Sequence, residues 1–384
     1  MEDLKCTKEN VNNCAFSSWY STFKSHTIRS LIIPLASEDV DYLRADGLVM
    51  PEGCDAPVYA GEDRSDDDSD NEKWEHDESY DTAAAPKLPN LVNNIKRSIS
   101  SLGGEVFPKC SWSAPRDAQW MSFNGTLRCQ TAYDVFLLLK TSDFVTHDLT
   151  QPYKDCSDSD DVDEVAGSYE LVLRKWRTVI PGMEFRCFVK SHTLVGACQR
   201  DASAFYEHLR EQHKTKDSSD GDYPAFVEHL RGDLTSEIQQ FFQQNISGKF
   251  PDPDYVVDIY RRAENTFWVI DFNPFSPTTD SLLFTWDELA RLKPCDDDDD
   301  NDDDSSSELV NPDDEPPAAA EAAPTASSSS PFEFRINSSQ GLQPSPFLSN
   351  RLPKDIIDLS SGEDINKFVD LFETSNLGGS HGEG

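Results

Sequence analysis

Tyr255-Val-Val-Asp-Ile-Tyr260, followed after a short polar turn by Phe267-Trp-Val-Ile-Asp-Phe-Asn-Pro274, is the stretch that decides the fold of this chain. Both runs are dense in β-branched and aromatic residues, and the segment between them is polar enough to turn the chain. The pattern therefore predicts a β-hairpin with strongly apolar strands, packed against a core.

The predicted hairpin carries three side chains with oxygen ligands, Asp258, Asp271 and Asn273. Side chains two positions apart in a strand share a face, so Asp271 and Asn273 point the same way and Asp258 can meet them from the neighbouring strand. One strand aspartate alone is about as often a solvated edge charge, but carboxylates among apolar neighbours need a partner. Two carboxylates and an amide oxygen suit magnesium shared with phosphate, so the hairpin predicts a nucleotide site.

Strands and helices mix in the chain before this hairpin. Strand-like runs rich in apolar residues predict strands at 105–109, 169–176, 184–190 and 194–200, with the last two forming a second hairpin. Helical spacing of apolar residues occurs at 87–105, 130–140 and 224–246. Because the order shows no regular βαβ repeat, the predicted fold class is α+β.

The 384 residues carry a formal net charge of −37, which is distributed unevenly along the chain. Acidic runs with Pro, Ala and Ser occupy 61–86 and the chain after 295, and this composition predicts a disordered loop and a disordered tail. We expect the chain after Pro294 to be dispensable for nucleotide binding. The excess of acids argues against direct contact with nucleic acid or an anionic membrane.

Several other classes of site are excluded by missing motifs. The nine cysteines form no C-x-x-C pair, which argues against a zinc ribbon or a redox motif and predicts reduced thiols. No P-loop, Rossmann or protein-kinase glycine motif is present. There is neither an apolar run long enough to cross a membrane nor an N-terminal secretory signal, so we expect a soluble, cytoplasmic protein.

Cationic side chains at the ends of the predicted strands are the candidates for binding a triphosphate. Each alone is more often a solvated surface group, but several together provide the positive charge that a triphosphate needs. Asp117 and Asp201 are candidate partners that hold these cations in place. The cations are Lys109, Arg116, Arg174, Lys175, Arg186 and Arg200.

At this point the residues carry a resemblance that covers about residues 15–292. The chain resembles the cell-division-cycle protein 123 family, also called D123. The motifs that carry the resemblance are Phe107-Pro-Lys-Cys-Ser-Trp-Ser-Ala-Pro-Arg-Asp-Ala118, Thr141-Ser-Asp-Phe-Val-Thr-His-Asp148, Leu171-Val-Leu-Arg-Lys-Trp176, Pro181-Gly-Met-Glu-Phe-Arg-Cys-Phe188, Gln199-Arg-Asp201, Asp258-Ile-Tyr260, Ile270-Asp-Phe-Asn-Pro274 and Thr279-Asp-Ser-Leu-Leu-Phe-Thr-Trp286.

The resemblance implies an ATP-grasp-like fold with a nucleotide cleft between two lobes. It places an N-terminal lobe at 1–150, a C-terminal lobe with the hairpin at 151–295, and the acidic tail at 296–384. It also implies an ATP- and magnesium-binding chaperone for assembly of eukaryotic translation initiation factor 2. The chaperone would act through the gamma subunit of the factor, and hence support translation initiation and cell-cycle progression.

The resemblance further implies which residues bind ATP and magnesium. Asp258, Asp271 and Asn273 would hold the metal, in agreement with the hairpin argument above. The other residues implied around the nucleotide are Lys109, Trp112, Ala114, Arg116, Arg174, Lys175, Trp176, Glu184, Arg186, Gln199 and Arg200.

Two alternatives stay open at the level of sequence. The chain could be an ATP-grasp ligase that activates a carboxylate as an acyl phosphate, although spacing identifies no second pocket for such a substrate. In the tail, Ile356, Ile357 and Leu359 precede acidic residues and resemble a motif that contacts a ubiquitin-like modifier. A residual apolar patch in a disordered tail explains that run equally well.

Overall fold

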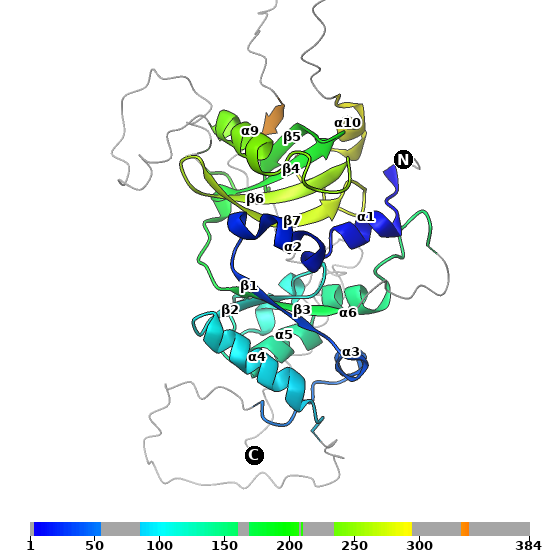
Figure 1. Ribbon diagram of the computed structural model, residues 1–384, viewed down its shortest axis with the longest axis vertical. Helices are drawn as coiled ribbons and strands as arrows, with labels where there is room; N and C mark the ends of the chain where they lie inside the picture. Colours follow the sequence, from blue (N-terminus) through cyan, green and yellow to red (C-terminus); the bar gives the residue numbers. More distant parts are fainter. Residues whose placement is uncertain are drawn as a thin grey trace, which may run out of the picture. The chain divides into compact units, whose positions relative to one another are not determined.

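The computed structural model describes residues 4–54, 85–159, 169–206, 209, 234–293 and 332–337, in which helices and strands are mixed (Figure 1). The predicted α+β class is confirmed. The chain divides into two compact units. The first is built mainly from residues 6–180, and the second from 181–202 and 206–338. The acidic loop at 61–84 and the tail residues Ile356, Ile357 and Leu359 lie outside the described residues.

The first unit contains a three-stranded antiparallel sheet in the order β1-β3-β2. Its strands are β1 (Ser30–Pro34), β2 (Val106–Lys109) and β3 (Glu170–Lys175). The central strand β3 is fully buried from Leu171 to Arg174, as its run of apolar residues predicts.

Helices cover this sheet and bury a large apolar core. They are α3 (Ser37–Arg44), α4 (Pro89–Ser101), α5 (Ala132–Lys140) and α6 (Asp143–Thr150), and Figure 1 shows α4 lying along the sheet. Ile95 and Phe136 are completely buried in this core beside Leu171. Helix α4 ends before Gly103 and Gly104, whose φ angles of 100° and 91° are accessible to glycine but strained for other residues.

Short helices at the start of the chain belong to the same unit. They are α1 (Lys8–Asn13), α2 (Phe16–Phe23) and the 3₁₀ turn η2 (Lys24–His26). The aromatic residues of α2 recur at helical spacing, so Phe16, Trp19 and Phe23 share one buried face. A 3₁₀ segment, η3 (Arg116–Met121), follows the loop after β2.

The second unit is a five-stranded sheet in the order β7-β6-β4-β5-β8. Both predicted hairpins are confirmed. The first pairs β6 (Tyr255–Ala263) with β7 (Thr266–Pro274), and the second pairs β4 (Glu184–Lys190) with β5 (Thr193–Gln199). The hairpins join each other through β4 and β6, and a 3₁₀ turn η4 (Pro181–Met183) precedes β4. The apolar strands therefore lie in the middle of the sheet, where the sequence requires burial.

Two helices pack onto this second sheet. Helix α9 (Leu234–Asn245) stacks Phe241 on Phe267 of β7, with ring centroids 5.1 Å apart. Helix α10 (Trp286–Arg291) packs its first residue, Trp286, against Phe188 of β4, and Phe284 of the preceding loop packs against the same ring. The predicted helix at 224–246 is described only from Leu234, so its first part stays a prediction.

Strand β8 (Glu333–Arg335) differs from the sequence prediction, which placed all residues after 295 in a disordered tail. It pairs in parallel with β5 at the edge of the second sheet and appears in orange beside β5 in Figure 1. Phe332 is buried and Arg335 is ion-paired, so local side chains attach this segment to the sheet despite the acidic, proline-rich surroundings.

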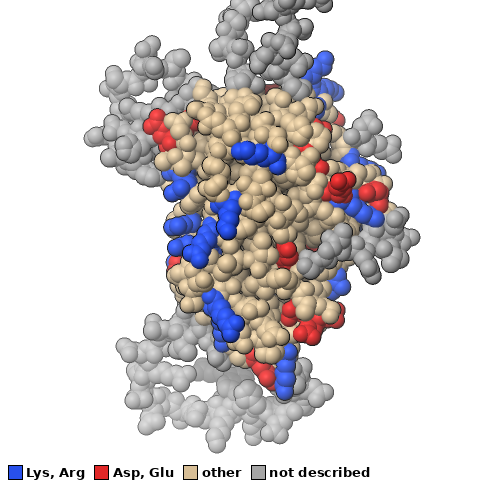
Figure 2. Space-filling model, viewed as in Figure 1, with Lys and Arg blue, Asp and Glu red and all other residues tan. Residues whose placement is uncertain are grey.

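The charged side chains, the cysteines and the helix lengths can be described for the part of the chain that the structure covers. Most of the surface in view in Figure 2 is uncharged, with lysine and arginine side chains scattered over it. The eight described cysteines are all free thiols. In the described ranges, every helix is too short or too polar to cross a membrane.

Candidate functional site

Two of the three predicted magnesium ligands, Asp258 and Asp271, are register partners in one row of residues across the second sheet. Arg186 of β4 is the register partner of Asp258 of β6, and Asp258 is in turn the partner of Asp271 of β7. Register partners in a sheet point to the same face. The expectation that Asp258 meets Asp271 from the neighbouring strand is therefore confirmed, and Asn273 follows two residues further along β7 on that face.

Two arginines hold the Asp258 carboxylate in this structure. Arg186 donates from Nε and Nη2 to the two oxygens of Asp258, at 2.8 Å each. Arg200 adds a third contact from Nε at 3.3 Å. Burial by itself would lower the pKa of Arg186, but the neighbouring Asp258 carboxylate raises that pKa above its ordinary value. Asp258 is thus a buried, ionised group whose charge is balanced by two arginines.

Three oxygen-bearing side chains on one face match the chemistry of a magnesium site. Among the described residues, no group of three or more His, Cys, Asp or Glu side chains has the arrangement of a metal site. The predicted set contains only two carboxylates together with an amide, Asn273. The magnesium assignment therefore stays a prediction, and any ion there would share its shell with water or phosphate oxygens.

The end of β5 is connected to the same row of residues. Arg200 follows β5 directly, and its backbone N–H donates to the carbonyl of Glu184 at 2.8 Å. Gln199 is fully buried. Its Nε2 donates to the carbonyl of Asp201 at 2.5 Å, and its Oε1 accepts a hydrogen bond from the backbone N–H of Asn337 at 2.8 Å. Arg200 is thus connected to Glu184 through the backbone and to Asp258 through its side chain. Gln199, in contrast, is the register partner of Phe185 and contacts Asp201 and Asn337.

The remaining predicted nucleotide residues lie in the first unit, where two cations are buried around one aromatic ring. Lys109 and Arg174 are 1% and 4% exposed. The Lys109 ammonium lies 5.6 Å from the ring centroid of Phe16, and the Arg174 guanidinium 5.4 Å from the same centroid. Arg174 also donates to Thr27 Oγ1 at 3.1 Å. Buried cations are costly unless an anion or a π-face compensates them, and the Phe16 ring offers such a face to both cations.

The loop after β2 carries Trp112, Ala114 and Arg116, and a buried carboxylate holds it. Asp148 of α6 accepts hydrogen bonds from the backbone N–H and the hydroxyl of Ser113, at 2.7 and 2.8 Å. Trp112 is half-buried and its indole N–H donates to the carbonyl of Val11 at 2.8 Å. The loop is therefore anchored at Trp112 and at Ser113, and Ala114 and Arg116 follow at partly exposed positions.

Burial shifts the ionisation of the carboxylate that anchors this loop. It raises the pKa of Asp148 to about 6, although the Ser113 hydrogen bonds and the nearby Lys109 ammonium act in the opposite direction. Asp148 is consequently linked to a predicted phosphate ligand by charge and to the loop by hydrogen bonds.

Lys175 and Trp176 end β3 and are partly buried. The backbone N–H of Lys175 donates to the carbonyl of Arg29, and that of Trp176 to the carbonyl of Glu105. Both residues are thus fixed through the backbone, which leaves their side chains at the end of the first sheet. Their predicted role beside the adenine stays a prediction.

The expected role of Asp117 as a partner of the cations is wrong. Its two oxygens instead accept hydrogen bonds at the start of α6, from Ser142 Oγ and the backbone N–H of Asp143 at 2.6 Å each, and from the N–H of Phe144 at 3.2 Å. A carboxylate satisfies the free N–H groups there and complements the positive end of the helix. Asp201 accepts a hydrogen bond from the hydroxyl of Tyr206 at 2.6 Å.

Three contributors to the site were missed in the sequence. Asp148 occupies the buried side of α6 beside Val145 and Leu149, and an acid at such an apolar helical position was the available signal. The carbonyl of Asp280 accepts a hydrogen bond from Arg186 at 2.6 Å, and a backbone contact leaves no sequence signal. Asn337 lies far along the chain in a region of tail-like composition, which concealed its contact with Gln199.

Comparison with known proteins places the chain among close relatives. A model of the D123 family matches residues 19–221 and 218–360. The chain is 42% identical over 367 residues to the translation initiation factor eIF2 assembly protein of Xenopus tropicalis, covering 95% of this chain and 96% of that protein. It is 33% identical over 409 residues to the protein of the same name from Dictyostelium discoideum, covering 96% and 97%.

A solved structure is similar as well. Cdc123 from Schizosaccharomyces pombe is 35% identical to this chain and aligns with a TM-score of 0.56, over 76% of this chain and 94% of the yeast chain.

Proposed function

This chain belongs to the D123 family, and from that premise we propose that it is an assembly protein for eukaryotic translation initiation factor 2 that binds ATP and magnesium. The relatives that carry the name of an eIF2 assembly protein align over nearly the whole chain, which supports the assembly role. We further propose the gamma subunit of the factor as the direct partner, in line with the family resemblance.

The observation that carries the nucleotide proposal is the row of Arg186, Asp258 and Asp271 across three adjacent strands. A buried carboxylate between two arginines costs stability unless the geometry is good, and fold stability alone does not require such a cluster. Phosphate oxygens attract arginines in bidentate geometry and magnesium attracts carboxylates. The arginines of this cluster would therefore bind the phosphates of an incoming nucleotide, and its carboxylates would bind the accompanying metal.

The first unit supports the same proposal independently. Lys109 and Arg174 are buried cations that lie over a common aromatic ring, and the neighbouring loop is anchored by Asp148. Pre-positioned cations of this kind neutralise phosphate charge without further ordering. Asp258, Asp271 and Asn273 would hold the magnesium, and the bound ion would supply positive charge for binding phosphate.

The metal proposal is tested by substituting Asp271, which is half-buried on β7. We expect Asp271→Ala to abolish magnesium-dependent ATP binding in calorimetry while circular dichroism and the unfolding midpoint stay near wild type. Glu264→Ala removes an exposed carboxylate from the turn of the same hairpin and serves as the matched control. Unchanged ATP affinity in Asp271→Ala would refute the metal assignment.

The assembly role is tested with purified subunits of the initiation factor. We expect the full chain to capture the gamma subunit in a pulldown. The same pulldown with the Asp271→Ala variant shows whether this capture depends on nucleotide. A turnover assay with small carboxylic acids runs in parallel. Robust, acid-stimulated ATP turnover without subunit capture would overturn the chaperone proposal in favour of a ligase that forms an acyl phosphate.

A further inference from the structure

Strand β8 reaches the sheet from a part of the chain well beyond α10, and it extends the row that contains the site. Cys198 of β5 is the register partner of Arg186 on one side and of Arg335 on the other. Arg335, Cys198, Arg186, Asp258 and Asp271 therefore form one continuous row across all five strands. A residue of the C-terminal region thus lies in line with the proposed nucleotide and metal ligands.

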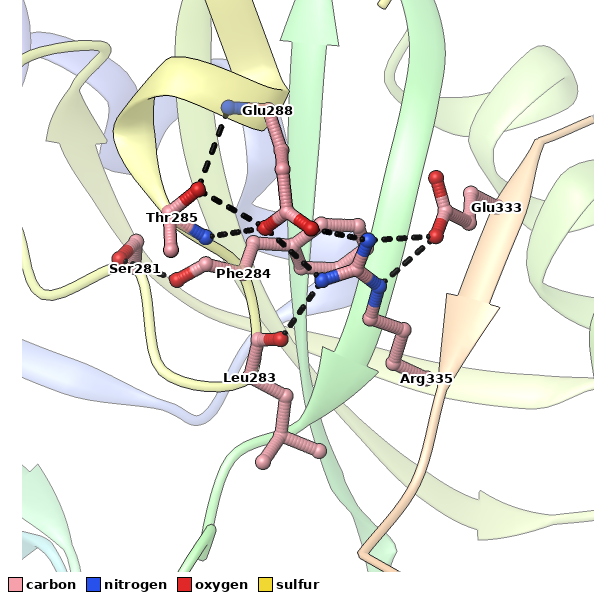
Figure 3. Close-up of polar contacts among 7 residues, drawn as sticks. All are labelled: Ser281, Leu283, Phe284, Thr285, Glu288, Glu333 and Arg335. Carbon is pink, nitrogen blue, oxygen red and sulfur yellow. Dashed lines mark hydrogen bonds and ion pairs between the residues drawn. The ribbon is translucent and has the colours of Figure 1, made fainter.

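Arg335 clamps the loop that precedes α10, as Figure 3 shows. Its Nη1 and Nη2 donate to the two carboxylate oxygens of Glu288 at 3.0 Å each, and Nη1 also donates to the carbonyl of Leu283 at 2.9 Å. The guanidinium lies 4.0 Å from the ring centroid of Phe284. Bidentate geometry combined with stacking is specific to arginine, because lysine offers a point charge and no plane.

The clamp on Glu288 is supported by its electrostatics and its local structure. Hydrogen bonds, foremost from Arg335 and then from Thr285, lower the pKa of Glu288 to about 2. Glu288 also accepts the backbone N–H of Thr285 at 2.7 Å and so closes the capping box of α10. The same carboxylate therefore joins the start of α10 to the C-terminal strand.

The clamped loop contacts the site at its other end. Arg186, which holds Asp258, donates from Nη1 to the carbonyl of Asp280 at 2.6 Å. Phe284 packs so closely on β5 that a Cβ added at Gly196 would lie 3.2 Å from its ring. The segment 280–288 is thus held by Arg186 at one end and by Arg335 at the other, and it lies against β5 between them.

A second connection runs through the backbone just after β8. The N–H of Asn337 donates to Oε1 of Gln199 at 2.8 Å, and its side-chain amide donates to the carbonyl of Ala202 at 3.2 Å. Both Gln199 and Asn337 are buried. Because Gln199 is adjacent to Arg200, this contact fixes the chain that delivers Arg200 to Asp258.

We propose that Arg335 and the backbone N–H of Asn337 are positioning groups for the nucleotide site, through which the C-terminal segment 332–337 orders the loop 280–288 and the end of β5. This inference rests on the proposed ATP and magnesium site. It contradicts the expectation that everything after Pro294 is dispensable for nucleotide binding. Neither group touches the ligand in this proposal, since each acts through a residue that it holds.

Four variants of the full chain test the proposal. Arg335→Ala removes the clamp, while Arg291→Ala removes an exposed arginine from α10 of the same unit and is its matched control. Asn337→Pro removes the backbone N–H that Gln199 accepts, while Asn337→Ala keeps that N–H and loses only the side-chain contact. Amide hydrogen exchange over 194–200 and calorimetry with MgATP are measured on each variant.

We expect Arg335→Ala and Asn337→Pro to raise amide exchange in β5 about tenfold or more, because β5 loses its pairing with β8. Amide exchange in α4 of the other unit should stay unchanged. Only a minor share of the molecules would then have the arrangement that binds MgATP, and the measured affinity for MgATP would fall in proportion to that share. If one molecule in five remains competent, the affinity falls about fivefold. Arg291→Ala and Asn337→Ala should stay within about twofold of wild type in affinity.

The outcomes separate this inference from the proposed function. Unchanged exchange in β5 for both test variants would overturn the inference, since the segment would then hold nothing. Raised exchange with unchanged MgATP affinity would also overturn it, because the segment would be structural only. If the wild-type chain binds no MgATP, the proposed function itself fails and the inference about the site falls with it, whatever the exchange in β5.

Discussion

At the scale of single residues, Asp148 is a carboxyl group whose ionisation is changed by burial. It is almost completely buried, accepts two hydrogen bonds from Ser113, and faces the charge of Lys109. Its carboxyl group therefore has three properties that an exposed aspartate lacks. It anchors the loop with Trp112 and Arg116, it balances a buried cation, and it titrates near neutral pH.

The titration of Asp148 gives a prediction for stability against pH. Its folded-state pKa of about 6 lies above the unfolded value of about 3.9, so the folded protein binds more protons between these values. Its contribution to stability is therefore fully present below about pH 4 and is lost as the pH rises through about 6, a change on the order of 3 kcal/mol.

Denaturant unfolding at a series of pH values measures this contribution. We expect Asp148→Asn to flatten the profile between about pH 4 and 6 relative to wild type, because the titrating group is gone. Asp143→Asn changes an exposed aspartate on the same helix and should leave that slope in place. Equal slopes for wild type and Asp148→Asn would contradict the assignment.

At the scale of elements, a buried ion pair joins α9 to β6. Arg261 of β6 is 1% exposed and donates to both oxygens of Glu237 of α9, at 2.8 and 2.5 Å. The backbone N–H of Asn265 in the hairpin turn donates to the same carboxylate at 3.0 Å. The Glu237 side chain thus fixes both the position of α9 and the turn between β6 and β7. A buried pair of this kind specifies an arrangement more than it adds stability.

This pair predicts a strongly non-additive response to mutation. Glu237→Ala should cost about 3–5 kcal/mol of unfolding free energy, because it leaves the Arg261 guanidinium buried without its partner. The double variant Glu237→Leu with Arg261→Met should cost much less, since both charges are then removed together. Denaturant unfolding of the singles and the double forms the cycle, and additive costs would show that the two side chains do not act as a pair.

At the scale of the whole molecule, the described part of the second unit combines three stretches of chain that are separated in sequence. Residues 181–202 and 234–293 form four strands and two helices, and residues 332–337 complete the sheet edge. The edge strand β5 would otherwise present unpaired N–H and C=O groups. The extent of the folded unit therefore reaches past the acidic runs that begin at Asp296.

Truncation separates this arrangement from a unit that ends at Pro294. A chain ending at Ser338 keeps every contact of β8 and should unfold near the wild-type midpoint. A chain ending at Pro294 loses buried Phe332, worth about 2 kcal/mol, together with the Arg335 contacts, and should unfold on the order of 5 °C lower. Scanning calorimetry compares the two, and equal midpoints would show that β8 adds nothing to the unit.

Both hairpins and the main helices of this protein were predictable because local pattern decides them. The two runs around Asp258 and Asp271 are short, strongly apolar and separated by a polar turn, a pattern that predicts a hairpin of buried strands. The same local rule placed Asp258 opposite Asp271, and helical spacing located α4 and α5. These features depend on residues that are close in sequence, where side-chain direction follows from backbone geometry.

Contacts between distant segments were decided only by the tertiary structure. Asp117 was expected to hold a cation but caps α6, because a helix start offers three donors that no spacing rule reveals. Arg335 lies in a tail-like composition, yet the sheet edge, Glu288 and Phe284 together outweigh the entropy of ordering it. The composition of a segment indicates only how much apolar surface that segment can bury by itself. Strand β8 is instead stabilised by contacts with a surface that the rest of the chain provides.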